Sequence, residues 1–142
     1  MIVRYLGWMF AVGLMGVSAQ AMAATSTISV NNLSTTANIT LTDLIVGSAA
    51  VSPTPSTTIA PGGSDSYVVT TIITSTGTGG GVTYSSGNKV CRFGWSGVKG
   101  TSGFWTFTKS AASSGTTAAT CTATLVGGNV TTGNAAWQFT MK

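Results

Sequence analysis

The chain has 142 residues, of which 6% are charged, with a formal net charge of +4 and no histidine. Its only acidic residues are Asp43 and Asp65. This composition excludes most polar active-site chemistry, because acid–base catalysis draws mainly on histidine and carboxylates. It also excludes a disordered, charge-rich chain, since 43% of the residues are hydrophobic and the mean hydropathy is +0.39.

The first 23 residues predict a secretory signal peptide. Arg4 precedes an apolar run from Leu6 to Val17, and an A-x-A cleavage site ends at Ala23. The alternative is a transmembrane anchor, but a run of about 12 residues is shorter than the ~20 that span a bilayer as a helix. We therefore expect one domain over residues 24–142. We also expect a secreted protein, extracellular or, if the source is bacterial, in the periplasm or at the cell surface.

Cys91 and Cys121 are the only cysteines, and both follow the predicted cleavage site. Two cysteines in an exported protein most simply form one disulfide, here closing a loop of about 30 residues. The alternative is two free thiols.

The remainder of the chain predicts β-strands throughout. Serine and threonine make up 42 of the 119 residues after Ala23, and threonine suits a half-exposed pleated surface. Apolar residues alternate with polar ones in successive runs, and the alternation changes phase at Leu44, which predicts a β-bulge or a strand that leaves its partner. The alternation predicts these shared faces: Ile28 and Val30; Ile39 and Leu41; Tyr67, Val69, Thr71 and Ile73; Val82 and Tyr84; Cys91, Phe93 and Trp95; Trp105 and Phe107; Ala119, Cys121, Ala123 and Leu125; and Trp137, Phe139 and Met141.

Turn signals separate these runs. The stretch Gly77–Gly81 predicts a flexible loop or a hairpin tip, and Gly127–Asn129 predicts a tight hairpin connection. Short strands at this spacing predict an all-β fold, a single antiparallel β-sandwich of about eight to nine strands with one disulfide. A closed barrel is the second choice.

Catalytic motifs are largely missing. Without histidine there is no Ser–His or Cys–His pair and no imidazole metal ligand. Two S-x-x-K strings, Ser86–Lys89 and Ser96–Lys99, lie in strand-like sequence, where residues three apart face opposite sides. We therefore predict a protein that is not an enzyme, with no cofactor and no metal.

One cluster stands out against this background. Four of the five basic residues after Ala23 fall between Lys89 and Lys109, interleaved with aromatic residues. Such mixtures bind anionic membrane surfaces, sugars or nucleic acid. A nucleic-acid partner is excluded by the modest charge and by export. The candidate ligand-binding residues are Trp95, Lys99, Phe104 and Trp105. The alternative is a core hairpin with solvated lysines on its outer face.

The order of these elements resembles that of the aegerolysin-like β-sandwich proteins. The similar features are an opening strand that ends in an asparagine pair (Ile28–Asn32), an I-x-P-G-x-S-x-x-Y step (Ile59–Tyr67), a glycine-rich G-x-V-x-Y stretch (Gly80–Tyr84) and late aromatic strands. The resemblance implies a β-sandwich that recognises membrane lipids, sometimes alongside a partner protein, and it carries over no site residue. The basic charge, the predicted export and the cysteine pair depart from the pattern.

Two functions follow as hypotheses. The first is a small secreted binding module for a membrane-lipid or glycan surface. The second is a structural subunit of an envelope or pilus-like assembly, which would associate with itself or with a partner protein. The late position of Cys91 and Cys121, and the ending Phe139–Lys142, differ from what is usual in fimbrial subunits.

Overall fold

A computed structural model describes residues 23–72 and 77–142. This part of the chain forms ten strands joined by loops, with no helix. No described segment is a helix long and apolar enough to cross a membrane. The predicted signal peptide lies outside the described residues, apart from Ala23 at the start of the first strand.

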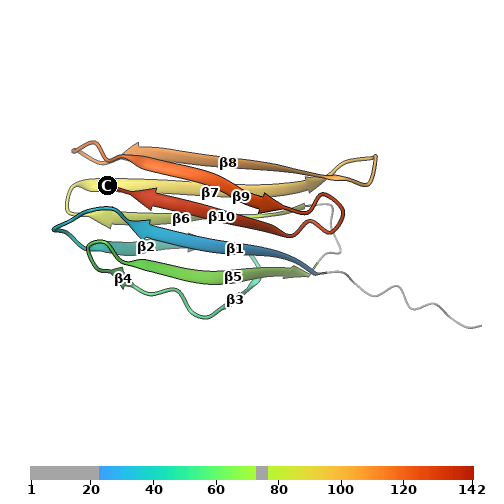
Figure 1. The fold of residues 1–142 in the computed structure, drawn as a ribbon, viewed down its shortest axis with the longest axis horizontal. Coiled ribbons are helices and arrows are strands. Elements are labelled where there is room, and N and C mark those ends of the chain that lie inside the picture. The colour runs from blue at the N-terminus through green and yellow to red at the C-terminus, as the bar shows by residue number, and fades with distance from the viewer. Residues whose placement is uncertain (1–22, 73–76) are drawn as a thin grey trace, which may run out of the picture.

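The strands form two sheets of five (Figure 1). In chain order they are β1 (Ala23–Asn32), β2 (Ile39–Ile45), β3 (Ala50–Ser52), β4 (Thr58–Ile59), β5 (Ser64–Ile72), β6 (Gly77–Ser86), β7 (Lys89–Lys99), β8 (Trp105–Ser114), β9 (Cys121–Gly128) and β10 (Ala135–Met141). One sheet has the order β3-β5-β1-β10-β9 and the other β4-β2-β6-β7-β8. The two sheets lie face to face in Figure 1, which is the predicted sandwich arrangement.

Two details of the predicted fold were wrong. The described chain has ten strands, not eight or nine. The prediction missed β3 and β4 because strands of three and two residues are too short to show an alternating pattern. The sheets are also not purely antiparallel, since β1 pairs with β10 in parallel, with Ile28 opposite Trp137. Alternation along a strand shows which residues share a face, but it does not show which strand lies alongside.

The core lies between the sheets and is densest where β7 faces β10. The rings of Phe93 and Phe139 stack with centroids 4.9 Å apart, and Trp95 lies 5.9 Å from Phe139. Phe107 meets Trp137 edge-on at 6.1 Å. Most residues of the predicted faces are buried, but seven are half-buried: Leu41, Thr71, Phe107, Ala119, Cys121, Ala123 and Leu125. Ile73 lies outside the described residues. The predicted bulge is also confirmed, as a register shift between Leu41 and Asp43 in the pairing of β2 with β6.

The glycine stretch Gly77–Gly81 is not a loop. It forms the first half of β6 and pairs with β7, with Gly80 opposite Trp95. A Cβ on Gly80 would lie 2.5 Å from the Trp95 indole, so a larger residue would displace the ring. Glycine is therefore needed here for close packing against an aromatic ring, a role that turn statistics do not reveal.

The predicted disulfide is confirmed. Cys91 on β7 and Cys121 on β9 are bonded, with their Cα atoms 5.6 Å apart. Because β7 and β9 belong to different sheets, the bond ties the two sheets together at one end of the sandwich.

We predict that the double variant Cys91→Ala/Cys121→Ala loses about 3–4 kcal/mol of unfolding free energy, because it releases a 30-residue loop constraint. Urea unfolding of this variant and of reduced wild-type protein measures the loss. Two alkylated thiols on the native, unreduced protein would contradict the bond.

Two buried tyrosines give the fold a pH dependence. Within the described residues, the hydroxyls of Tyr67 on β5 and Tyr84 on β6 have no hydrogen-bond partner. Burial, aided by the nearby Asp65 carboxylate, raises the pKa of Tyr84 from 10.0 to about 12. Burial also raises the pKa of Tyr67, with smaller contributions from the charges of Tyr84 and Asp65. In the unfolded chain both groups titrate near pH ~10.

The raised folded-state pKa contributes to the free energy of unfolding. This contribution is fully present below pH ~10 and is lost as the pH rises toward the folded-state pKa. We therefore predict that the Tm of the protein falls above pH ~10 and that Tyr84→Phe reduces the fall. At neutral pH, where both hydroxyls stay protonated, the substitution should cause no ionisation-linked loss of stability. Thermal scans of both proteins from neutral to alkaline pH provide the measurement, and identical slopes would contradict the prediction.

Candidate functional site

One end of the sandwich is built from two connecting loops. The β7–β8 loop is closed by hydrogen bonds from Gly100 N–H to Phe104 O (2.8 Å) and from Gly103 N–H to Gly100 O (2.9 Å). Gly103 has a φ of 83°, a conformation that side-chain-bearing residues rarely adopt. These hydrogen bonds hold the backbone of Phe104, the last residue before β8.

The second loop joins β9 to β10. It is six residues long, so the predicted tight connection at Gly127–Asn129 was wrong. The side chain of Asn129 holds the loop by accepting hydrogen bonds from the backbone N–H groups of Thr131 and Thr132. The connection is therefore a longer loop held by an asparagine side chain, and not the short turn that the glycine pair predicted.

Three contacts join this second loop to its surroundings. Trp105 N–H donates to Val130 O (2.8 Å), and Thr25 N–H donates to the Asn134 side-chain oxygen (2.9 Å). The Trp105 ring lies over Gly133, where a Cβ would come within 2.5 Å of it. The two loops and the start of β1 therefore form one supported end of the molecule.

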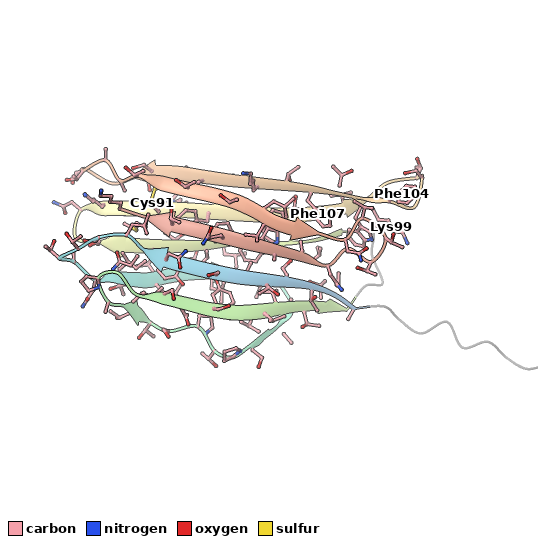
Figure 2. The ribbon with its side chains drawn as sticks, viewed as in Figure 1. Cys91, Lys99, Phe104 and Phe107 are labelled. Carbon is pink, nitrogen blue, oxygen red and sulfur yellow. A yellow bond between two sulfur atoms is a disulfide. The ribbon has the colours of Figure 1, made fainter. Side chains whose placement is uncertain are left out.

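The four candidate residues divide into two pairs. Trp95 and Trp105 are buried, Trp105 with 4% of its surface exposed, so neither offers its ring to a surface ligand. Lys99 is exposed and Phe104 is 57% exposed. Figure 2 shows Lys99 and Phe104 together at the same end of the sandwich. The sequence implied that only one of Phe104 and Trp105 faces the core, and Trp105 is that residue.

Two further apolar residues accompany this pair. Val98 is 54% exposed and Val130 is 49% exposed. Val98 pairs with Thr106 on β8, and Phe104 immediately precedes β8, whose first residue, Trp105, pairs with Lys99. The carbonyl oxygen of Val130 accepts a hydrogen bond from the N–H of Trp105, the residue after Phe104. We call Val98, Lys99, Phe104 and Val130 the tip patch. The alternation that places Trp95 inside also places Val98 outside, so Val98 was readable from the sequence, whereas Val130 was not.

The electrostatics of the tip patch are simple. Lys99 is its only charged residue, and within the described chain its ammonium group has no salt bridge or hydrogen bond. Of the two aspartates, Asp43 lies on β2 and Asp65 lies at the start of β5, at the other end of the sandwich. The patch therefore combines an apolar surface with a single unpaired positive charge.

Groups for catalysis or metal binding do not gather in the described part of the chain. It contains no cluster of three or more residues that could hold a metal ion. The Asp65 carboxylate accepts a hydrogen bond from Ser56 N–H (2.7 Å), a local structural contact. Ser96, from one S-x-x-K string, shares a hydrogen bond with Thr108 (2.6 Å).

No protein-family model matches the sequence, and no curated protein is similar to it. The fold is nevertheless similar to that of several solved structures. The lipid-binding protein Nakanori shares 15% identity, with a TM-score of 0.63, over 84% of this chain and 71% of its own. IP-1A from Alcaligenes faecalis shares 16% identity, with a TM-score of 0.58, over 85% and 91% of the two chains. RahU, solved in complex with TRIS, shares 11% identity, with a TM-score of 0.59, over 83% and 93%.

The resemblance to aegerolysin-like proteins is supported at the level of the fold. Identities of 11–16% concern the arrangement of strands and no individual site residue. The evidence for a site in this chain therefore remains the tip patch itself.

Phe104 and Trp105, which are neighbours in the sequence, give a direct test of the difference between an exposed and a buried aromatic residue. We predict that Trp105→Ala costs about 3–5 kcal/mol of unfolding free energy, because it leaves a cavity over Gly133. Phe104→Ala should change the unfolding free energy by less than about 0.5 kcal/mol, as for most surface substitutions. Denaturant unfolding of both variants measures the difference, and a large loss from Phe104→Ala would show that Phe104 supports the fold.

Proposed function

We propose that this protein is a secreted, non-catalytic binding protein that attaches to the surface of a lipid membrane through the tip patch. The observation that carries the proposal is the exposure of Phe104, Val98 and Val130 at one end of the sandwich, beside the unpaired charge of Lys99. Lipid binding by Nakanori, which has a similar fold, adds support. The disulfide is consistent with an extracellular or periplasmic location.

The tip patch suits an interface between water and lipid. Aromatic and aliphatic side chains gain free energy by entering the acyl boundary, while a lysine remains near the phosphates. Val98 and Lys99 project from the end of β7, and Phe104 and Val130 from loops that are hydrogen-bonded to the sandwich, so little conformational entropy is lost on binding. The buried Trp105 supports the loops from below and does not contact the ligand.

The size of the patch predicts weak attachment. Complete burial of a valine or phenylalanine side chain contributes about 1.5–3 kcal/mol, and roughly half of each side chain is already buried. The three side chains together therefore contribute about 2–4 kcal/mol. One lysine adds about 1 kcal/mol at an anionic surface. The total corresponds to a Kd in the millimolar range, so attachment by a single copy is reversible.

We predict that Phe104→Ala weakens vesicle binding about fivefold to tenfold, because its exposed ring area is lost to the interface. Co-sedimentation with vesicles of phosphatidylcholine and phosphatidylglycerol, over a range of lipid concentrations, measures the effect. Lys99→Gln should weaken binding to these anionic vesicles and leave binding to pure phosphatidylcholine unchanged. Added salt should reduce the contribution of Lys99, because exposed charges are screened over about 8 Å at physiological ionic strength.

Leu33→Ala is the matched control. Leu33 is 50% exposed, similar to Phe104, but it directly follows β1 at the opposite end of the sandwich. Equal losses from Leu33→Ala and Phe104→Ala would show nonspecific adhesion and overturn the proposal. Binding of the parent to a glycan array, with no retention on any vesicle, would replace the lipid with a sugar.

A further inference from the structure

A pocket with a volume of about 320 Å³ opens at the end of the sandwich opposite to the tip patch. It lies where the last residues of β1, β6 and β10 meet the first residues of β2 and β7, and it therefore spans the mouth between the two sheets. Its volume is at the lower end of the range of small-molecule sites, ~300–1,000 Å³. We call it the far-end pocket. None of the tip-patch residues lines it.

The far-end pocket combines apolar and polar lining. Ile39 and Met141, each 1% exposed, lie beneath the pocket floor, and accessible apolar atoms come from Ala37 and the methyl groups of Thr36 and Thr117. Ser86, Asn88 and Thr117 contribute hydroxyl and amide groups. A ligand that fills this pocket needs an uncharged body to contact the apolar residues and hydrogen-bonding atoms to meet the polar ones.

The charge of the lining is positive. Lys89 and Lys142 line the pocket, and within the described chain neither ammonium group forms a salt bridge or a hydrogen bond. No aspartate lines it. Asp65 lies at the same end of the sandwich, but its carboxylate accepts the hydrogen bond from Ser56. The main-chain oxygen of Lys142 accepts a hydrogen bond from Thr120 N–H (2.8 Å). Two unpaired ammonium groups beside one cavity favour an anion.

The pocket wall is held in shape by a buried asparagine. The side-chain amide of Asn32 donates hydrogen bonds to the carbonyl oxygens of Ala37 (2.8 Å), Ile59 (3.0 Å) and Ala60 (3.1 Å). Its side-chain oxygen accepts a hydrogen bond from Ser34 N–H (3.0 Å). One fully satisfied side chain therefore fixes the β1–β2 loop, which forms one side of the pocket.

The disulfide holds the other side. Cys91 lies two residues after Lys89, and Cys121 follows Thr120, which exchanges two backbone hydrogen bonds with Lys142. The bond therefore keeps the segments that carry Lys89 and Lys142 together. A pocket that is formed before the ligand arrives loses less binding free energy to ordering.

We propose that the far-end pocket binds a small phosphate-bearing molecule. The phosphate lies at Lys89 and Lys142 and accepts hydrogen bonds from the neighbouring hydroxyl and amide groups, an arrangement in which lysine acts as a point charge. The uncharged body of the molecule lies against Ala37 and the methyl groups of Thr36 and Thr117. Strands of ten and eleven residues, with a rise of about 3.3 Å per residue, place the pocket about 30 Å from the tip patch. A membrane that contacts the tip patch does not reach the pocket, so the ligand comes from solution.

The test is a titration of the isotope-labelled protein, followed by the NMR signals of its backbone amides, with sn-glycerol 3-phosphate and with inorganic phosphate. We expect saturable shifts at Asn88, Lys89 and Thr117 and none at Phe104. Glycerol phosphate should bind more tightly than inorganic phosphate, because its body reaches the apolar residues. Absence of a saturable shift with either probe, or an equal response to acetate, overturns the proposal.

Variants separate the pocket from general charge attraction. Lys89→Gln/Lys142→Gln should weaken glycerol phosphate binding by about tenfold or more, since it removes both charges that face the phosphate. Arg92→Gln is the matched control, because Arg92 is exposed on β7 and does not line the pocket. Thr117→Trp fills the pocket entrance without a change of charge and should abolish binding. Equal losses from the control, or full binding by Thr117→Trp, overturn the proposal.

A vesicle assay separates this inference from the proposed function. Vesicles that contain phosphatidic acid offer the same phosphate on a lipid. If Lys89→Gln/Lys142→Gln reduces retention on them and Phe104→Ala does not, the phosphate source is a lipid headgroup and the tip patch proposal fails while the pocket stands. If only Phe104→Ala reduces retention and the soluble probes bind, both proposals stand, with ligands at opposite ends.

Discussion

The packing of β7 against β10 across the interior is the interaction on which the rest of the structure depends. These strands belong to different sheets, and the stacked rings of Phe93 and Phe139 join them. The domain has few charges, and its many hydroxyl groups lie on half-exposed strands, so aromatic burial supplies much of the driving force for folding. Two glycines allow this density: Gly80 on β6 leaves room for the ring of Trp95, and Gly133 in the β9–β10 loop leaves room for the ring of Trp105.

This core divides the molecule into a rigid centre and two ends with different surfaces. The end with the tip patch presents apolar side chains on closed loops, whereas the other presents a polar, basic pocket. Both surfaces are formed by loops and strand ends, where side chains do not have to serve the core. The stability of the domain is therefore largely separate from its proposed binding surfaces, and substitutions such as Phe104→Ala and Lys89→Gln can be studied in folded protein.

Much of the fold could be read from the sequence, because strand alternation directly reports which side chains are buried. It identified the inward-facing residues, the bulge near Leu44 and the pairing of the cysteines. It failed where the outcome depends on contacts between distant segments. The parallel pairing of β1 with β10 leaves no local pattern, and the role of Gly80 is defined by an indole that arrives from β7.

The candidate site residues show the same difference between what local sequence patterns reveal and what depends on distant contacts. Lys99 and Phe104 were identified from a local cluster of basic and aromatic residues, and they do lie together. Trp95 and Trp105 belong to the same cluster but are buried in the core. The prediction included them because composition does not distinguish a core tryptophan from an exposed one. Val130 comes from a loop about thirty residues along the chain, and the far-end pocket draws on four separate segments of the chain. Such sites exist only once the sheets have assembled.

The parallel pairing of β1 with β10 also determines where each end of the domain emerges. Because the two strands run in the same direction, β1 begins at the end of the sandwich that carries Phe104, and β10 ends at the opposite end (Figures 1 and 2). A fluorescent protein or affinity tag fused after Lys142 would leave the tip patch open but crowd the far-end pocket. A tag fused before Ala24 would do the reverse. The two ends of one domain thus offer a selective means of masking either surface without changing a single residue of the fold.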